Sequence, residues 1–350
     1  MRRNGYDSYH GRSRVRTFLK VLIVLLLVVL AVAVGALLWL EPYIDYSANG
    51  IKINLPFFQQ KEPAPATGAP VVVTTPEPTP TPEPEEDFRG ILLPNSALYD
   101  GTAAQRVEAA GATAALFDMK ADDGSLGYIS RLALAIQAEA SAADPALNAA
   151  IQLLNGGEVY TVARVSCFRD NLVPRSDMSL AIHTNAGNWR DSGDTRWLSP
   201  ANESARQYVV GVCRELAALG FDEILLDNWG YPAEGNLGYI KQGNAYDLEH
   251  LSQPVEEFLA RAEAALEPYG TRLALRSTWA VLEGDESPGG QTAQLLERYA
   301  QRVWLEAPED GMADLLSQAG LPEGEERLAL LVEELDPDLD CSQGIWDPEA

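Results

Sequence analysis

The chain has 350 residues, of which 51 are acidic and 26 are basic, and its formal net charge is −25. Residues 1–20 hold six of the basic side chains and one acid, so the rest of the chain carries a net charge of −30. Such a surface repels phosphate backbones, which argues against nucleic acid as a partner and favours neutral substrates. Solubility alone explains the acidity equally well.

Residues 21–40 contain no charged side chain, and 20 apolar residues at about 1.5 Å each span a hydrocarbon core of about 30 Å. The basic cluster before this run and Trp39 at its end predict a helix that enters the membrane from the cytoplasm. A cleaved signal peptide is the alternative, but its apolar region is about 7–15 residues and ends at a small-residue cleavage site. We therefore expect a signal-anchor in the cell membrane, which places residues 1–20 in the cytoplasm, residues 21–40 in the lipid bilayer and the main domain outside.

Residues 41–87 are expected to form an extracytoplasmic linker rich in Pro, Thr and Glu. Eight of residues 62–86 are proline, which fixes φ and removes hydrogen-bond donors, so this stretch predicts an extended spacer rather than a folded core. The folded domain is then residues 88–350, close to the roughly 250 residues of a (β/α)8 barrel.

Short apolar runs alternate with helical patterns through this domain, which predicts an α/β fold. A doubly wound sheet would share the alternation, but no GxGxxG or phosphate-binding loop follows any strand, so we favour a TIM-like barrel. Only residues 335–343 separate the last two predicted strands, so the barrel is expected to close irregularly there. The predicted strands are 90–94, 114–120, 159–168, 223–227, 272–279, 303–307, 328–334 and 344–347.

Three helices carry clear boundary signals. Ser199 is the expected N-cap of a helix that begins at Pro200 and ends at Gly220. Two further helices are expected over residues 254–266 and 292–300. Cys167 and Cys213 lie in apolar segments and are expected to be small core residues. Three cysteines do not make a disulfide framework, but a single disulfide between two of them remains an alternative.

Carboxylates, arginines and tryptophans recur where the predicted strands end, and six of the seven tryptophans lie between residues 189 and 346. The carboxyl ends of parallel strands share one rim, and indole faces beside carboxylates suit a polysaccharide or oligosaccharide. For each residue alone, core packing or helix capping is an adequate explanation. The histidines show no metal-ligand spacing and no GxSxG is present, so no metal, cofactor or serine triad is predicted.

Four ordered motifs, DMKADDG (118–124), ARVSCFRD (163–170), NWRD (188–191) and GFDEILLDNWGYP (220–232), resemble the putative glycoside hydrolase domain family. That family is related to the α-amylase-like TIM barrels, and its members are often extracytoplasmic in Firmicutes. The resemblance implies that Asp227 occupies the nucleophile position. It also implies binding roles for Lys120, Asp122, Asp123, Arg164, Asp170, Trp189, Arg190 and Asp191.

Two departures from the family pattern affect the expected chemistry. The arginine of the strand-four motif is replaced by Gly230, and the acid at the end of strand five is replaced by Ser277 or Thr278. A glycosidase needs two carboxyl groups, about 5–5.5 Å apart for retention or about 6.5–9.5 Å for inversion. Glu306 is the preferred general acid, because Trp304 and an apolar strand are expected to bury it; Glu333 and Glu334 are the alternatives.

We therefore expect hydrolysis of a cell-envelope or extracellular polysaccharide, with Asp227 as nucleophile or electrostatic stabiliser and Glu306 as acid. The alternative is a catalytically inactive glycan-binding barrel, and a scaffold role unrelated to sugar is third. Arg164 and Arg190 would orient Asp227 or bind sugar. The full set of expected substrate-binding residues is Asp118, Lys120, Asp122, Asp123, Arg164, Asp170, Trp189, Arg190, Asp191, Trp229, Tyr231, Trp279 and Glu333. Sugar, linkage and oligomeric state are not predictable from these residues.

Overall fold

The computed structural model describes residues 44–47, 50–53, 88–285, 287–307, 327–336 and 341–346. The chain divides into two compact units, residues 1–79 and residues 80–350, and each is described by itself. The predicted membrane helix (21–40) and most of the predicted linker lie outside the described residues. No helix within the described ranges is both long and apolar enough to cross a membrane.

The first unit contains a two-stranded antiparallel sheet inside the region predicted to be linker. Strand β1 (Ile44–Ser47) pairs with β2 (Gly50–Ile53), and Ile44 lies opposite Ile53. These strands alternate isoleucine or tyrosine with polar residues, a pattern typical of β-structure, and they precede the proline-dense stretch.

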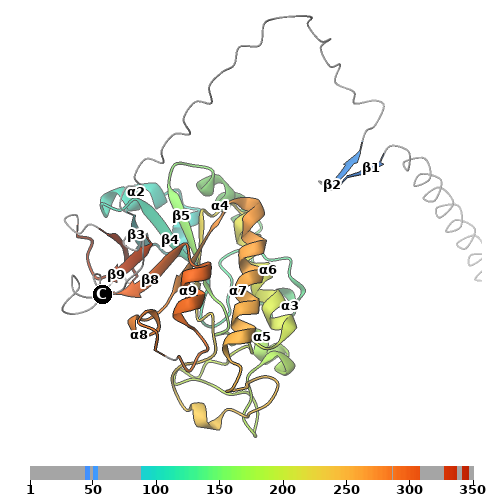
Figure 1. The fold of residues 1–350 in the computed structure, drawn as a ribbon. Helices are drawn as coiled ribbons and strands as arrows, with labels where there is room; N and C mark the ends of the chain where they lie inside the picture. Colours follow the sequence, from blue (N-terminus) through green and yellow to red (C-terminus); the bar gives the residue numbers. More distant parts are fainter. Residues whose placement is uncertain are drawn as a thin grey trace, which may run out of the picture. The chain divides into compact units, whose positions relative to one another are not determined.

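The second unit is a closed barrel of eight parallel strands, which confirms the predicted fold class (Figure 1). The order around the barrel is β10-β3-β4-β5-β6-β7-β8-β9, so neighbours in the chain are neighbours in the sheet. All eight predicted strands are present, with ends that differ by up to three residues. Their bounds are β3 (Arg89–Leu92), β4 (Ala114–Lys120), β5 (Tyr160–Ser166), β6 (Glu223–Asp227), β7 (Arg272–Arg276), β8 (Arg302–Glu306), β9 (Leu328–Val332) and β10 (Ser342–Ile345).

Strand β10 closes the barrel at the point where an irregular closure is predicted. Gly344 pairs with Leu331 of β9 on one side and with Gly90 of β3 on the other. The described residues between β9 and β10, 333–336 and 341, contain no helix, and the sheet closes with parallel pairing.

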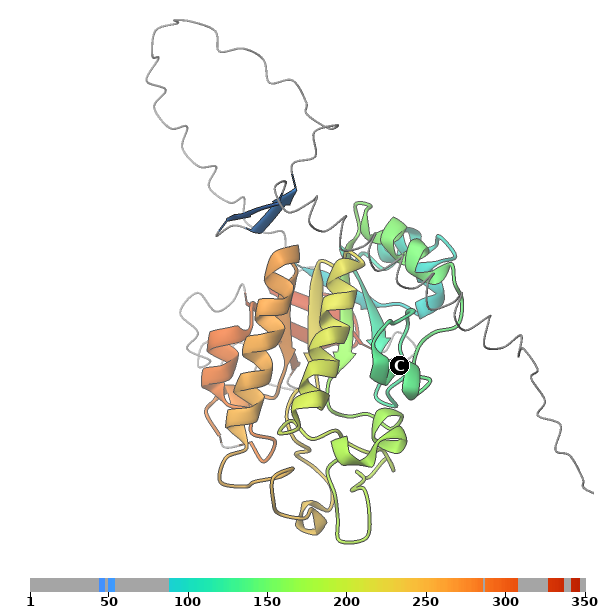
Figure 2. The same ribbon diagram turned by 90° about the vertical axis from the view of Figure 1, so that its right-hand side faces the viewer.

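Helices cover the outside of the barrel, and the two longest, α6 and α7, lie side by side against it (Figures 1 and 2). The predicted N-cap Ser199 is wrong: Asn202 caps α6, because its side chain accepts hydrogen bonds from the Ser204 and Ala205 amides. The other two predicted helices match α7 and α9 within two residues. The described helices are α2 (Ala103–Ala109), α3 (Ala133–Gln137), α4 (Leu147–Asn155), α5 (Val173–Ser176), α6 (Glu203–Ala218), α7 (Ser252–Leu266), α8 (Trp279–Leu282) and α9 (Ala293–Tyr299), with short 3-10 turns η2 (Asn95–Leu98), η3 (Met178–Leu180), η4 (Leu237–Tyr239) and η5 (Glu267–Tyr269).

Alternate residues of each strand point into the barrel and fill it in layers, as expected for this fold. The middle of the barrel is apolar and is filled by one cluster of buried side chains that includes Leu116, Val162, Leu225 and Trp304. One layer towards the amino ends, Glu223 is fully buried and forms an ion pair with Arg302. The layer at the carboxyl ends is charged and forms the floor of the site described below.

Two long segments extend beyond the carboxyl end of the barrel and build the walls of the site. One connects β5 to α6 and the other connects β6 to α7, and Figures 1 and 2 show them together at one end of the molecule. The three cysteines are buried and free, so Cys167 and Cys213 are core residues as predicted and no disulfide links any of the three.

The interior packing gives a stability prediction. An alanine at position 344 would place its Cβ 2.3 Å from Trp304 Cζ3, and the Trp304 ring is fixed by an edge contact with Phe88 at 5.6 Å between centroids. Gly344→Ala should therefore lower the free energy of unfolding by about 1–3 kcal/mol, the usual cost of overpacking a core. Gly238→Ala is the control, since nothing lies within 4 Å of its added Cβ. Urea unfolding of the full chain measures both, and equal midpoints would contradict the packing argument.

Candidate active site

Five consecutive strands carry charged side chains of alternating sign at or near their carboxyl ends, and these side chains meet over the barrel floor. They are Asp118 of β4, Arg164 of β5, Asp227 of β6, Arg276 of β7 and Glu306 of β8. Each arginine donates hydrogen bonds to the carboxylates on both of its sides. The alternation follows from the fold, because inward-facing positions at the ends of parallel strands become neighbours around the rim. We call these five residues the charged arc.

Asp227 is the centre of the charged arc and is buried. Its Oδ2 accepts hydrogen bonds from Arg164 Nε (3.1 Å), Arg164 Nη2 (2.7 Å) and Arg276 Nη1 (3.0 Å). Its Oδ1 accepts from the backbone amide of Asn228 (2.8 Å), a residue with φ of 48°. Four donors from three residues therefore fix the orientation of this carboxylate, which suits a group that must face one atom of a substrate.

Arg164 binds two further carboxylates, so it holds three parts of the site together. It lies 3.0 Å from Asp118 and 2.6 Å from Asp122. Burial lowers the pKa of Arg164, but the charges of Asp227, Asp118 and Asp122 outweigh burial and raise it. Burial raises the pKa of Asp118, and Arg164 offsets only part of that effect.

Trp346, immediately after β10, completes the floor. The guanidinium carbons of Arg164 and Arg276 both lie 5.1 Å from the centroid of its ring. Cation–π contacts of this length are attractive, and the ring also leaves neither arginine free to turn towards β10. The last strand of the barrel therefore contributes directly to the position of both arginines.

A second group of polar residues forms one wall of the site. Arg169 donates to Asp191 (2.7 Å) and forms an ion pair with Asp122, while the Trp197 indole donates to Asp191 (3.1 Å). Burial raises the pKa of Asp191, but the bonds from Arg169 and the Thr195 amide outweigh it and lower the pKa. Since Asp122 touches both Arg164 and Arg169, the wall and the floor are one connected network.

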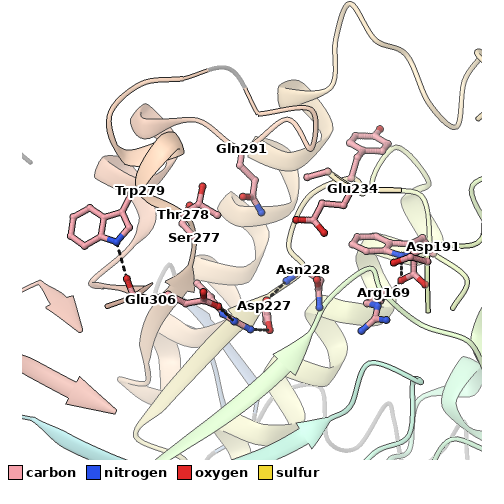
Figure 3. Close-up of a pocket in the computed structure, with 15 residues that line it drawn as sticks. Arg169, Asp191, Asp227, Asn228, Glu234, Ser277, Thr278, Trp279, Gln291 and Glu306 are labelled. Carbon is pink, nitrogen blue, oxygen red and sulfur yellow. Dashed lines mark hydrogen bonds and ion pairs between the residues drawn. The ribbon is translucent and has the colours of Figure 1, made fainter. Parts of the chain in front are cut away.

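These groups surround a cleft of about 590 Å³ (Figure 3). Asp227, Asn228 and Arg276 form its floor, and Trp197, Tyr231 and Trp279 contribute aromatic surface. A cleft of this size with aromatic faces beside carboxylates is suited to sugar rings, which present apolar C–H faces and polar hydroxyl edges.

Glu306 lies in the same cleft as Asp227, and Arg276 joins the two. Arg276 Nη2 lies 2.9 Å from Glu306 Oε1, and its Nη1 lies 3.0 Å from Asp227 Oδ2. Because both nitrogens belong to one planar guanidinium, the two oxygens are at most about 8 Å apart, a bound that admits both glycosidase geometries. The predicted burial of Glu306 is wrong: its side chain is 76% exposed, since Trp304 points into the barrel interior below it.

Three residues expected to bind substrate have structural roles instead. Lys120 and Asp170 form a fully buried ion pair with a separation of 2.9 Å, and Asp170 also accepts bonds from the Leu172 and Val173 amides at the start of α5. Asp123 is exposed and accepts bonds from Ser125 within its own turn. Neither the pair nor Asp123 lines the cleft.

Four more expected binding residues lie away from the substrate space. Trp189 and Trp229 are buried, and their indoles donate to backbone carbonyls of Asn236 (3.1 Å) and Arg276 (2.7 Å). Arg190 forms an ion pair with the exposed Asp194 and lines a different pocket, so it does not orient Asp227. Glu333, beyond the end of β9, is exposed and does not line the cleft.

The expected residues that the structure does bring to the site are Asp118, Asp122, Arg164, Asp191, Asp227, Tyr231, Trp279 and Glu306. The Trp279 indole donates to the Glu306 carbonyl (2.8 Å). The sequence reasoning missed Arg276, Trp346 and Glu234. Arg276 could have been predicted, because strand residues alternate between faces and Arg276 lies two positions after Ala274, which points into the barrel.

Gly230, where the resembled family has arginine, lies in a tight backbone crossing. A Cβ at this position would lie 2.4 Å from the Gly289 carbonyl oxygen, and the amide of the next residue, Tyr231, donates to that oxygen (2.8 Å). No larger side chain fits there. In this chain the arginines bound to Asp227 are Arg164 of β5 and Arg276 of β7.

The shared role of Arg164 predicts a large loss of stability when it is removed. Arg164→Gln leaves three carboxylates without this cation and should lower the free energy of unfolding by about 3–5 kcal/mol. Arg190→Gln removes an exposed pair with Asp194 and should cost less than about 1 kcal/mol. Urea unfolding measures both variants, and similar losses would show that the charged arc does not hold the site together.

Comparisons with solved structures find several barrels at low similarity. A hypothetical protein from Ruminiclostridium thermocellum is 24% identical, with a TM-score of 0.46, over 53% of this chain and 96% of that one. The glycoside hydrolase domain of PgaB (BpsB) from Bordetella bronchiseptica is 15% identical, with a TM-score of 0.48, over 70% and 83%. Ega3 from Aspergillus fumigatus, in complex with galactosamine, is 14% identical, with a TM-score of 0.40, over 72% and 81%. These similarities are too low to carry information about activity.

No curated protein matches the chain. A family described as "Putative glycosyl hydrolase domain" matches residues 102–307, more than half of the chain, and this span includes every member of the charged arc. The chain belongs to that glycosyl hydrolase domain family.

Proposed function

We propose that the barrel hydrolyses glycosidic bonds in a polysaccharide of the cell envelope or the extracellular space. The observation that carries this proposal is the buried Asp227 carboxylate, fixed by two arginines at the floor of a cleft with aromatic walls. A fixed anion beneath a sugar ring stabilises the positive charge that develops at the anomeric carbon, or bonds to that carbon. Membership of the glycosyl hydrolase domain family supports the same chemistry.

The substrate-binding surface in this proposal consists of Asp191, Trp197, Tyr231 and Trp279 around the cleft. Trp279 is partly exposed and has an aromatic face that can stack on a sugar ring, whereas Trp197 and Tyr231 are buried and contribute ring edges; the carboxylate of Asp191 accepts hydrogen bonds from hydroxyl groups. Its position is set by Arg169, which keeps it at the cleft wall. The mostly acidic chain disfavours phosphate-rich polymers, so a neutral or cationic glycan fits better.

A second candidate function, glycan binding without hydrolysis, is favoured by one observation. In the charged arc, each of the three carboxylates accepts a hydrogen bond from an arginine. A general acid must present a proton to the glycosidic oxygen, and the arginine contact takes up one of the two oxygens that could carry that proton. If no other carboxyl group supplied that proton, the barrel would bind sugar and not cleave it.

The role of Asp227 is tested by Asp227→Asn. We expect hydrolysis to fall by at least about 10²–10³-fold, because the developing positive charge loses its anion, while glycan binding persists. Release of reducing ends from a panel of purified envelope polysaccharides measures the first, and a glycan array measures the second. Asp247→Asn, an exposed residue outside the cleft, is the control. Hydrolysis that survives Asp227→Asn contradicts the assignment, and wild-type binding without any hydrolysis supports the second function.

The proposed location rests on the apolar run of residues 21–40. The full chain should be found in the membrane fraction, and protease added outside intact spheroplasts should digest the barrel. A chain without residues 1–41 should be soluble and protected inside the cell, whereas deletion of residues 62–86 should leave membrane attachment unchanged. Protection of the full chain from added protease would contradict an extracytoplasmic domain.

A further inference from the structure

One carboxyl group of the cleft differs from the others in having no cation beside it. The cleft is lined by Asp191, Asp227, Glu234 and Glu306. Three of these are bound by arginines: Asp191 by Arg169, and the other two by Arg276. Among the described residues, no hydrogen bond or ion pair engages the Glu234 side chain.

Glu234 is exposed, and its carboxylate points into the cleft, towards Asn228 and Gln291 (Figure 3). It comes from the β6–α7 segment, whereas Glu306 comes from β8, so the two acids approach the floor from different elements. The cleft that Asp227 lines therefore holds a further carboxyl group, Glu234, which the pattern of charged residues at strand ends does not predict.

The segment that carries Glu234 is held on both sides. Before it, the Tyr231 amide donates to the Gly289 carbonyl (2.8 Å). After it, the Asn236 carbonyl accepts from the buried Trp189 indole (3.1 Å), and Gly235 packs over that indole with φ of 92°. Tethers two or three residues away on each side limit the positions that the Glu234 backbone adopts, as a catalytic side chain requires.

Glu306, in contrast, has the Arg276 guanidinium between itself and Asp227. A glycosidic oxygen cannot lie directly between these two carboxylates unless the guanidinium moves.

We propose that Glu234 is the proton donor to the leaving group, an inference that rests on the proposed glycosidase function. The Glu234 proton passes to the glycosidic oxygen as the bond from that oxygen to the anomeric carbon breaks, and the bonding electron pair leaves with the oxygen. Asp227 stabilises or bonds to the anomeric carbon, and water supplies the hydroxyl group that replaces the leaving group. The remaining water proton returns to Glu234 in a retaining course; in an inverting course it passes through Asp227 to solvent, and Glu234 regains a proton from solvent.

The test compares two kinds of substrate on the full chain. The first is an oligosaccharide, whose leaving group needs a proton, and the second is the 2,4-dinitrophenyl glycoside of the same sugar, whose leaving group does not. Glu234→Gln should lower kcat/KM on the oligosaccharide by about 10²–10⁴-fold and change it less than about 10-fold on the dinitrophenyl glycoside. It should also remove the alkaline limb of the kcat/KM pH profile.

Three further variants make the result specific. Glu249→Gln makes the same chemical change at an exposed, cleft-remote position of the same segment and should change neither substrate's kcat/KM. Glu306→Gln should affect both substrates to the same extent. Asp227→Asn should abolish turnover of both, because an anion at the anomeric carbon is needed whatever the leaving group.

Two results would overturn the inference and leave the glycosidase function intact: a Glu234→Gln variant with unchanged activity, or one with equal losses on both substrates. The leaving-group signature in Glu306→Gln instead would assign the proton to Glu306. A wild-type chain that binds glycans and turns over neither substrate class would overturn the proposed function itself, and this inference with it. Glu234 is exposed and makes no hydrogen bond or ion pair with any described residue. The Glu234→Gln variant should therefore have the same urea unfolding midpoint as the wild type, and a loss of activity in it is then not caused by unfolding.

Discussion

The pairing of buried charges at the carboxyl end of the barrel is the constraint on which the site depends. A buried carboxylate is costly unless cations and hydrogen bonds surround it, and Asp227 meets this requirement only because Arg164 and Arg276 reach it from the two adjacent strands. Both arginines then need partners on their outer sides, which extends the alternation across five strands. Trp346 fixes both guanidinium groups from below, so a residue near the end of the barrel helps to position its centre. The orientation of Asp227 is thus a property of the closed barrel rather than of one loop.

The family match ends at residue 307, before the two strands that close the barrel. Beyond the match, β10 pairs with both of its neighbours and places Trp346 against the arginines. Closure in this region depends on small residues: Gly344 and Gly90 leave the space that Trp304 and Leu116 occupy. These two glycines therefore let β3 and β10 pair closely at the point where the barrel closes.

The architecture was predictable from the sequence because buried parallel strands are short apolar runs, and all eight runs are strands. Asp227 and Arg164 were also predictable, from motifs at strand ends. The roles of Lys120, Asp170 and Trp229 were not, because a polar or aromatic residue near the rim can face either the cleft or the layer beneath it, and only the packed structure distinguishes the two. Arg276 was not predicted, because the family pattern leads one to expect an acid at the end of its strand. Glu234 lies in a long segment after β6, where no periodic pattern indicates which way a side chain points.

The central claim is that a glycosidic bond lies over Asp227 with its leaving oxygen facing Glu234. A crystal structure of the Asp227→Asn variant with an intact oligosaccharide tests it most directly. The account predicts the anomeric carbon of the scissile bond above residue 227 and the glycosidic oxygen within hydrogen-bond distance, about 3 Å, of the Glu234 carboxyl group. An oligosaccharide whose glycosidic oxygen faces Glu306 with Arg276 displaced, or one bound with no glycosidic bond above residue 227, would contradict it.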